Sequence, residues 1–239
     1  MYDLPRALPG LEALEWAAGA DVDRVARHTG TRAPLPTDGF WVFAEMGDSH
    51  LDRVRDRAGA TLLALAESVI ETLVRDNWLD ENRIAIADTV ADQRELWIFR
   101  ERMTESINAD AVPIKLDVGV PLDEFAGLYD RIPEYVREVE PTATAALFGH
   151  LAEGNFHINL LPAPRTPRFA PETAHLLENT VLEAVLAAGG TVSAEHGIGR
   201  AKQRWLIRQR GPAQCHLMSQ IKAAWDPNRL LNPGVLFDH

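Results

Sequence analysis

The chain has 239 residues, 46% hydrophobic and 25% charged, which is the composition of a globular protein with one large domain or two small ones. Its formal net charge of −11 makes nucleic acid and anionic membranes poor partners. The single cysteine, Cys215, excludes a disulfide framework and a cysteine-based zinc site, and it indicates a reducing cytoplasm. We expect no membrane span and no signal peptide, because no apolar run is long enough for either.

The first half of the chain predicts alternating strands and helices. Residues 40–46 are rich in aromatic and β-branched side chains and predict a buried strand, whereas residues 50–77 have the apolar period of a helix. We expect a strand at residues 83–88, a helix at 90–107 and a strand of alternating polarity at 112–121.

The second half begins with a helix pattern at residues 122–140, which Pro133 would kink or break. Residues 143–150 and 155–162 predict two strands, joined by a short turn at residues 152–154. Such a hairpin brings the side chains at the ends of its strands close together.

Helix patterns dominate the end of the chain. Residues 171–188 predict a helix that two glycines end, residues 191–197 predict a strand, and residues 200–225 predict a helix interrupted at Gly211. The whole order of elements predicts an α+β fold, in which helices cover an antiparallel sheet.

The segment of residues 148–162, FGHLAEGNFHINLLP, combines strand character with polar side chains. Side chains alternate along a strand, so His157 and Asn159 share one face. His150 ends the preceding strand, and the short hairpin would bring the two imidazoles near each other. Neutral imidazoles at such a separation are a common start to a metal site.

A third ligand could come from the sequence TVSAEHGIGR, in which Glu195 and His196 precede glycines. Two histidines and one carboxylate leave an open position for substrate, as catalytic divalent sites require. On spacing alone, however, two histidines in a strand pair are more often hydrogen-bonded structural residues than ligands. The residues by themselves leave both a metal site and a structural cluster open.

Three motifs in this order resemble one family: GHLAEGNFHIN from residue 149, GGTVSAEHGIGRAK from residue 189 and LLNPG from residue 230. They resemble the C-terminal half of the flavin-linked D-2-hydroxy-acid dehydrogenases, which are vanillyl-alcohol-oxidase-like flavoproteins and include D-lactate, glycolate and D-2-hydroxyglutarate enzymes. ELWIFRERMTESINADAVPIKLDVGVP, residues 95–121, is similar to the D-2-hydroxyglutarate branch in particular. The resemblance implies the ferredoxin-like substrate, or cap, domain of FAD-linked oxidases.

The resemblance also implies a role for each candidate residue in the motifs. His150, His157 and Glu195 would hold a divalent metal, zinc or manganese, which would act as a Lewis acid on the substrate hydroxyl. His196 would be the catalytic base that takes the hydroxyl proton. The hydrogen on Cα would leave as hydride to FAD, giving a 2-oxo acid.

Further residues would bind substrate and cofactor. Arg100 and Thr104 share a helix face and, with Lys115, would bind a carboxylate of a small anionic 2-hydroxy acid, which Asn159 would also touch. A solvated salt bridge is the alternative role for Arg100 and Lys115. Asn232 would lie near the flavin, and its alternative role is an ordinary Asn-Pro turn.

The chain departs from the family pattern in two respects. Ala152-Glu153 stands where the family usually has Gly-Asp, and alanine resists a positive φ. The glycine-rich domain that holds most of the FAD has no counterpart, because we expect residues 1–39 to be a lead-in and residues 40–239 to be the substrate- and metal-binding domain. We therefore expect a separate FAD-binding subunit or domain, with this chain as a split subunit, a truncated product or an expressed fragment.

The leading hypothesis is the C-terminal part of an FAD-dependent D-2-hydroxy-acid dehydrogenase. The alternative is a non-catalytic relic or binding module that keeps the fold and the metal site without turnover. A metal hydrolase built on two histidines and a glutamate is a third hypothesis, but it would not explain Arg100, Thr104, Lys115 and the LLNPG segment together.

Overall fold

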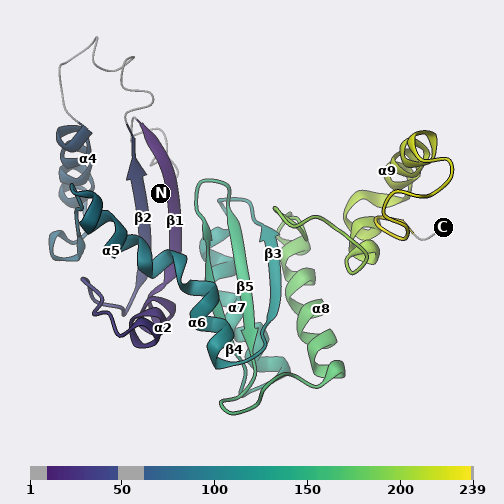
Figure 1. The fold of residues 1–239 in the computed structure, drawn as a ribbon, viewed down its shortest axis with the longest axis horizontal. Coiled ribbons are helices and arrows are strands. Elements are labelled where there is room, and N and C mark those ends of the chain that lie inside the picture. Colours follow the sequence, from purple (N-terminus) through teal and green to yellow (C-terminus); the bar gives the residue numbers. More distant parts are fainter. Residues whose placement is uncertain (1–9, 48–61, 238–239) are drawn as a thin grey trace, which may run out of the picture.

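A five-stranded antiparallel sheet forms the centre of the computed structural model, which describes residues 10–47 and 62–237 (Figure 1). The strand order is β2-β1-β4-β5-β3. The strands are β1 Leu11–Ala18, β2 Phe40–Met46, β3 Ile114–Gly119, β4 Thr144–His150 and β5 Asn155–Leu161. The helices are α2 Gly19–Thr29, α4 Leu62–Arg75, the 3-10 turn η2 Glu81–Arg83, α5 Val90–Glu101, α6 Met103–Asp110, α7 Phe125–Val139, α8 Pro171–Ala187 and α9 Gln203–Trp225. The α+β fold expected from the sequence is confirmed.

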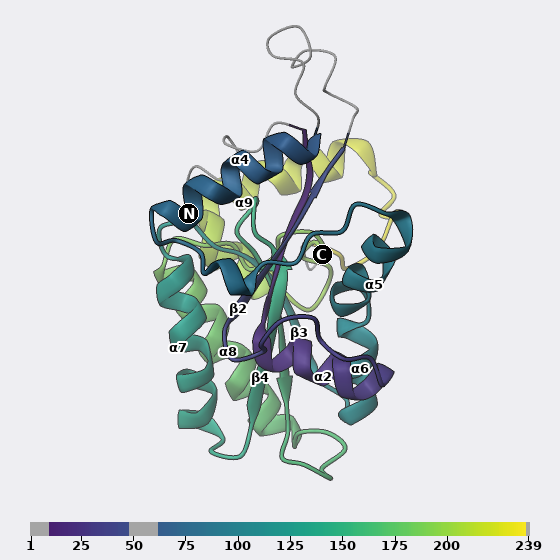
Figure 2. The same cartoon turned by 90° about the vertical axis from the view of Figure 1, so that its left-hand side faces the viewer.

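One face of the sheet packs against α7 and α8 (Figure 2). Trp16 of β1 lies at its centre, with its ring centroid 4.6 Å from that of Phe156 in β5 and 5.0 Å from that of Phe125 in α7. The indole Nε1 of Trp16 donates a 3.0 Å hydrogen bond to the carbonyl oxygen of Asn155. This bond satisfies the polar atom of a fully buried ring, which is the condition for placing tryptophan in a core.

The opposite face packs against α2, α5 and α6 (Figure 2) and holds a second apolar core. Phe99 of α5 and Met103 of α6 belong to it, together with Phe148 of β4. Toward β5 and β3 the same face becomes polar, because Phe148 is paired with His157, and His157 with Asp117. Paired residues share a face, so the second core borders a cluster of ionisable side chains.

The chain after α8 extends beyond the sheet, and α9 lies away from β1 and β2 (Figure 1). Gly211, with φ 77°, interrupts α9, as the sequence predicts. After α9 the tail returns to the loop before it: the backbone nitrogen of Leu236 donates to Gly199 O at 3.1 Å, and Gln203 Nε2 donates to Gly234 O at 2.7 Å. The LLNPG segment therefore lies against the end of the GGTVSAEHGIGRAK segment.

Two predicted strands are wrong. Residues 83–88 have no strand partner among the described residues, and Ile86 is 54% exposed, so this segment lacks a buried face. Residues 191–197 form only an isolated bridge, between Thr191 and Gly119, and then bend into a loop. Within the described ranges, the first segment lacks a neighbouring strand to pair with. The second leaves the edge of β3 after one bridge, because Asp117 accepts hydrogen bonds from the backbone nitrogens of Glu195 and His196.

The other expected elements are confirmed where they are described, with shifted ends. α7 runs through Pro133 without a break, and the helix expected before β3 is divided at Arg102 into α5 and α6. The helix expected at residues 50–77 is described only from Leu62, and its beginning lies outside the described residues. Residues 1–39, expected as a lead-in, contribute β1 to the interior of the sheet, as well as α2.

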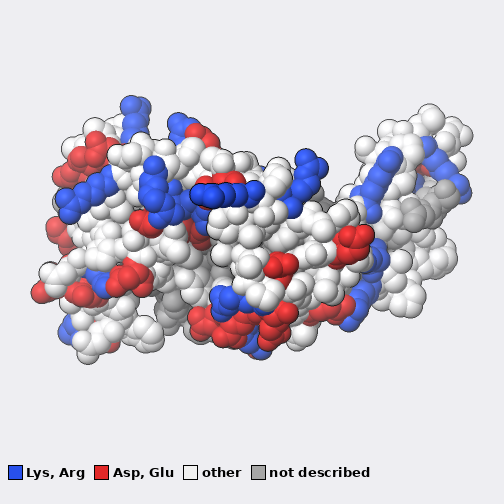
Figure 3. Space-filling view, turned by 90° about the horizontal axis from the view of Figure 1, so that it is seen from below, with Lys and Arg blue, Asp and Glu red and all other residues white. Residues whose placement is uncertain are grey.

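The surface carries charges of both signs. Lys and Arg side chains are interspersed with Asp and Glu over the face in Figure 3, so this face offers nucleic acid no broad basic patch. Among the helices in the described ranges, none is sufficiently long and apolar to cross a membrane.

Candidate metal centre and active site

Two side chains of one hairpin and one from a later loop meet beside the second core. His150 ends β4, His157 lies in β5, and Glu195 belongs to the loop after α8. His150 Nε2 lies 3.0 Å from Glu195 Oε1 and 3.4 Å from His157 Nε2, and His157 Nε2 lies 3.7 Å from the same carboxylate oxygen. One ligand atom of each residue thus lies within 4.8 Å of the other two. Two imidazoles and a carboxylate are a donor set that suits zinc or manganese.

The hairpin that positions the two histidines depends on one glycine in its turn. Gly154 has φ +64°, and a Cβ on it would lie 2.1 Å from Val120 O. Ala152 is not among the residues with positive φ. The turn therefore places its left-handed residue at the glycine and tolerates alanine two residues earlier.

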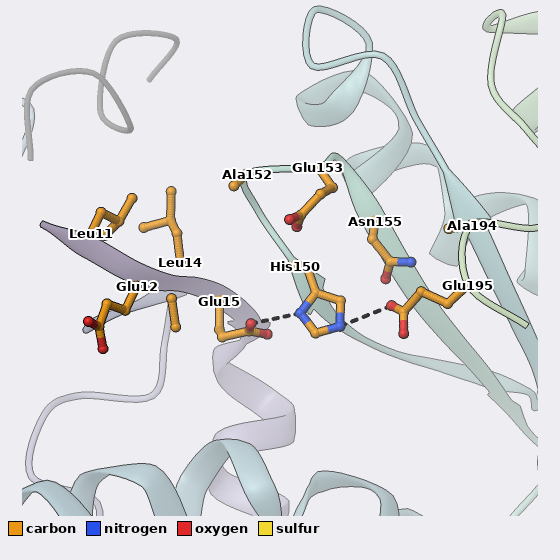
Figure 4. Close-up of a pocket in the computed structure, with 11 residues that line it drawn as sticks. Leu11, Glu12, Leu14, Glu15, His150, Ala152, Glu153, Asn155, Ala194 and Glu195 are labelled. Carbon is orange, nitrogen blue, oxygen red and sulfur yellow. Dashed lines mark hydrogen bonds and ion pairs between the residues drawn. The ribbon is translucent and has the colours of Figure 1, made fainter. Parts of the chain in front are cut away.

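Glu15 of β1 supports the cluster from the side opposite Glu195 (Figure 4). Its Oε1 lies 2.7 Å from His150 Nδ1, and its Oε2 accepts a 2.9 Å hydrogen bond from Arg100 Nε. Strand pairing creates the first contact, since Glu15 is the β1 residue paired with His150. Glu15 was not among the site residues expected from the sequence, although a carboxylate within the apolar stretch LEALEWAA was a usable signal.

Asp117 of β3 holds the loop that carries the third ligand candidate. Its Oδ2 accepts 2.8 Å hydrogen bonds from the backbone nitrogens of Glu195 and His196, and its Oδ1 accepts from Asn155 Nδ2 at 2.9 Å. Burial raises the pKa of Asp117, but these hydrogen bonds outweigh burial and hold the pKa below its usual value. Asp117 is therefore an anion at neutral pH. It was also missed, and its signal was a lone aspartate inside the strand IKLDVG.

His157 and His196 have different environments. Burial lowers the pKa of His157, and the charge of Arg100 lowers it further, so this imidazole is neutral and can offer a lone pair. The His196 side chain is 66% exposed, and its ring stacks on that of His157 at a centroid distance of 6.2 Å. An accessible imidazole beside the cluster can exchange a proton with a molecule bound there.

The expected substrate-binding residues are only partly gathered at this face. Lys115 and Asn159 are paired across β3 and β5 on the same face as His157. Lys115 is exposed, whereas Asn159 is buried and its Nδ2 lies 3.5 Å from His157 O. Arg100 reaches the face from α5, with its guanidinium carbon 4.9 Å from the ring centroid of Phe148.

Two expected residues lie apart from these contacts. Thr104 is exposed on α6, and Asn232 is exposed in the tail, with φ 47°. Within the described residues, no hydrogen bond or ion pair joins either side chain to the histidine–glutamate cluster.

A cavity of about 570 Å³ adjoins the cluster (Figure 4). The described residues that line it include His150 and four glutamates, Glu12, Glu15, Glu153 and Glu195, and none of these described residues is a lysine or an arginine. In Figure 4, the His150 ring lies between the carboxylates of Glu15 and Glu195. Carboxylates gathered in a concave site favour a cation there, so both the electrostatics and the donor set fit a divalent metal.

Comparison with known proteins assigns this architecture to a family. The model for the C-terminal domain of FAD linked oxidases matches residues 6–236. The mitochondrial D-2-hydroxyglutarate dehydrogenase of Bos taurus is 33% identical over 95% of this chain and 39% of its own length. The D-2-hydroxyglutarate dehydrogenase of Xanthomonas citri pv. viticola is 32% identical over 98% of this chain and 47% of its own length. The chain thus spans less than half the length of these curated relatives.

A solved structure supports the fold. The 4-ethylphenol oxidase from Gulosibacter chungangensis, in its isoeugenol complex, matches 93% of this chain and 46% of its own, with a TM-score of 0.51. At 16% sequence identity, this match shows a shared fold and nothing about the substrate. Because the family model covers nearly the whole chain, from β1 to the LLNPG tail, the protein belongs to the FAD-linked oxidase C-terminal domain family.

Proposed function

We propose that this chain is the substrate- and metal-binding part of an FAD-dependent D-2-hydroxy-acid dehydrogenase, of the D-2-hydroxyglutarate or the D-lactate and glycolate type. The observation that carries the proposal is the meeting of His150, His157 and Glu195, with the accessible His196 beside them. The relatives named D-2-hydroxyglutarate dehydrogenase support the choice of substrate class. We also propose a cytoplasmic location for this chain. The Bos taurus relative, in contrast, is named as mitochondrial.

The proposed chemistry divides between this chain and its cofactors. When bound, a zinc or manganese ion would supply Lewis acidity to the substrate hydroxyl, and FAD would supply the hydride acceptor. Oxidation removes the hydroxyl proton and the hydrogen on Cα with its electron pair, and it leaves a 2-oxo acid. His196 takes the proton, and the charged Asp117, whose Oδ2 lies 3.8 Å from His196 Nδ1, stabilises the resulting imidazolium.

The cationic residues of this face would bind the acid. Lys115 is the exposed cation closest in register to His157, and Asn159 beside it offers an amide to the same ligand. Arg100 and Thr104 complete the proposed set from α5 and α6. An anionic substrate needs these charges, because the adjoining cavity is lined with glutamates and the whole chain is acidic.

A flavin-binding subunit or domain is the proposed partner. The sequence has no glycine-rich loop of the GxGxxG kind to bind the FAD pyrophosphate. α9 presents Leu217, Ile221 and the 86% exposed Trp225 at four-residue intervals, which is an apolar stripe suited to docking. Asn232 lies in the tail that follows this stripe, and there we propose that it contacts the flavin.

Metal analysis of the purified chain tests the proposal. We expect close to one divalent ion per chain, and we expect His157→Ala to lose it, while His216→Ala, at an exposed position of α9, keeps it. Unchanged metal content in His157→Ala would end the assignment of the ligands. A chain that binds metal but supports no turnover with any flavin-binding partner would instead be the non-catalytic binding module.

A further inference from the structure

Glu15 uses its two carboxylate oxygens on two different partners. Its Oε1 lies 2.7 Å from His150 Nδ1, while its Oε2 lies 2.9 Å from Arg100 Nε and 2.8 Å from Arg100 Nη2. The side chain of Glu15 is 12% exposed and that of Arg100 is 15% exposed, so the pair is largely removed from water. β1 lies inside the sheet, between β2 and β4, which gives Glu15 a rigid base.

We propose that Glu15 is a positioning residue that holds His150 in the tautomer protonated at Nδ1 and fixes the orientation of Arg100. This role rests on the proposed function, in which His150 is a metal ligand. An ionised carboxylate can only accept, so Glu15 at 2.7 Å from Nδ1 and Glu195 at 3.0 Å from Nε2 compete for the one proton of a neutral His150. The shorter contact, to the less exposed of the two carboxylates, favours the proton on Nδ1. Nε2 is then left unprotonated beside Glu195 and His157, and in a metal-loaded site it would offer its lone pair to the ion that the three residues share.

The same carboxylate determines what Arg100 can offer to a substrate. Nε and Nη2 are both bound to Glu15, and within the described residues Nη1 has no hydrogen-bond partner. The charges of Arg100 and Glu15 largely offset each other, so Arg100 provides its three remaining N–H donors and little net charge. Lys115 would then supply most of the net positive charge that a substrate carboxylate meets.

The tautomer of His150 tests the proposal without any metal. Long-range proton–nitrogen NMR of the ¹⁵N-labelled, metal-free chain, at a pH where imidazole is neutral, separates the two tautomers, and His150→Gln assigns the signal. We expect Nδ1 to be protonated in the wild-type chain and the proton to move toward Nε2 in Glu15→Ala. A wild-type His150 protonated at Nε2 would overturn the proposal. The wild-type spectrum gives this result even if Glu15→Ala fails to fold.

Zinc affinity, measured by chelator competition, gives the second test. We expect Glu15→Ala and the isosteric Glu15→Gln to bind zinc roughly 10- to 100-fold more weakly than the wild-type chain. Glu138→Gln is the control, because Glu138 is exposed on α7, over the opposite face of the sheet. If both Glu15 variants fold and keep the wild-type affinity, the proposal is wrong. A wild-type chain that binds no zinc would refute the proposed function instead. The tautomer of His150 in the metal-free chain would still test the role of Glu15.

Discussion

The carboxylate of Asp117 accepts a 2.8 Å hydrogen bond from the backbone nitrogen of His196. The same oxygen accepts from the backbone nitrogen of Glu195 at 2.8 Å, so one buried anion on β3 fixes both the third ligand candidate and the proposed base. The loop owes its shape to a side chain 78 residues earlier, and this explains why residues 191–197 do not continue as a strand.

We predict that Asp117→Asn loosens this loop. The amide oxygen accepts more weakly than a carboxylate, so we expect the free energy of unfolding to fall by about 1–3 kcal/mol and zinc affinity to fall roughly tenfold. Urea unfolding and chelator competition measure the two effects. Asp123→Asn, at an exposed position shortly after β3, is the control and should change neither. Wild-type zinc affinity in Asp117→Asn would show that the hydrogen bonds to the loop do not matter for the ligand.

Lys115 offers a cleaner test of substrate binding than Arg100, because removal of Arg100 would take away the partner of Glu15 Oε2 and leave Glu15 with His150 as its one partner among the described residues. We predict that Lys115→Ala weakens binding of the dicarboxylate 2-hydroxyglutarate to the zinc-loaded chain by about 1 kcal/mol, a factor of about five. Lactate, with one carboxylate, should lose less. Calorimetric titration measures both ligands.

The control for this charge is Arg137→Ala, since Arg137 is exposed on α7, over the opposite face of the sheet. It should leave both affinities unchanged. Equal losses for 2-hydroxyglutarate and lactate in Lys115→Ala would mean that Lys115 does not bind a second carboxylate.

Asp21 should make the stability of the chain depend on pH. Burial raises its pKa to about 6 from 3.8, despite hydrogen bonds from the backbone nitrogen of Leu147 at 2.8 Å and from Arg24. The folded chain therefore holds this proton more tightly than the unfolded chain. The stability contributed by Asp21 is full below pH 3.8 and is lost as the pH rises through about 6.

Asp21→Asn removes this titration and keeps an acceptor for Leu147. We predict that the free energy of unfolding of the variant, relative to the wild-type chain, rises by about 1 kcal/mol between about pH 5 and about pH 7.5. Urea unfolding at both pH values gives the difference. A difference that stays constant over this range would place the pKa of Asp21 near its ordinary value.

The hairpin with His150 and His157 could be predicted because residues close together in the sequence determine it. Alternating polarity fixed the face of each side chain, and the glycine in the turn fixed the connection. The antiparallel sheet and most of its helices followed from the same kind of pattern.

The supporting residues could not be predicted in this way. Glu15 reaches His150 across 135 residues, and Asp117 reaches Glu195 across 78. Both contacts depend on the strand order β2-β1-β4-β5-β3, which no local periodicity encodes. A carboxylate inside an apolar strand was the available signal in each case, but it does not indicate which residue the carboxylate contacts.

The apolar stripe on α9 leads to the last prediction, which concerns the flavin. We expect the purified chain to be colourless and inactive with 2-hydroxy acids, and a separately expressed flavin-binding part to restore colour and turnover. The double variant Leu217→Ser with Ile221→Ser should lower the affinity for that part at least roughly tenfold, because two docked apolar side chains are lost. Ile86→Ser, at an exposed position outside α9, should leave this affinity unchanged.

His196→Ala should bind the flavin-binding part with normal affinity and show no turnover, which separates assembly of the two parts from catalysis. A yellow and active preparation of this chain alone would refute the proposed division of labour.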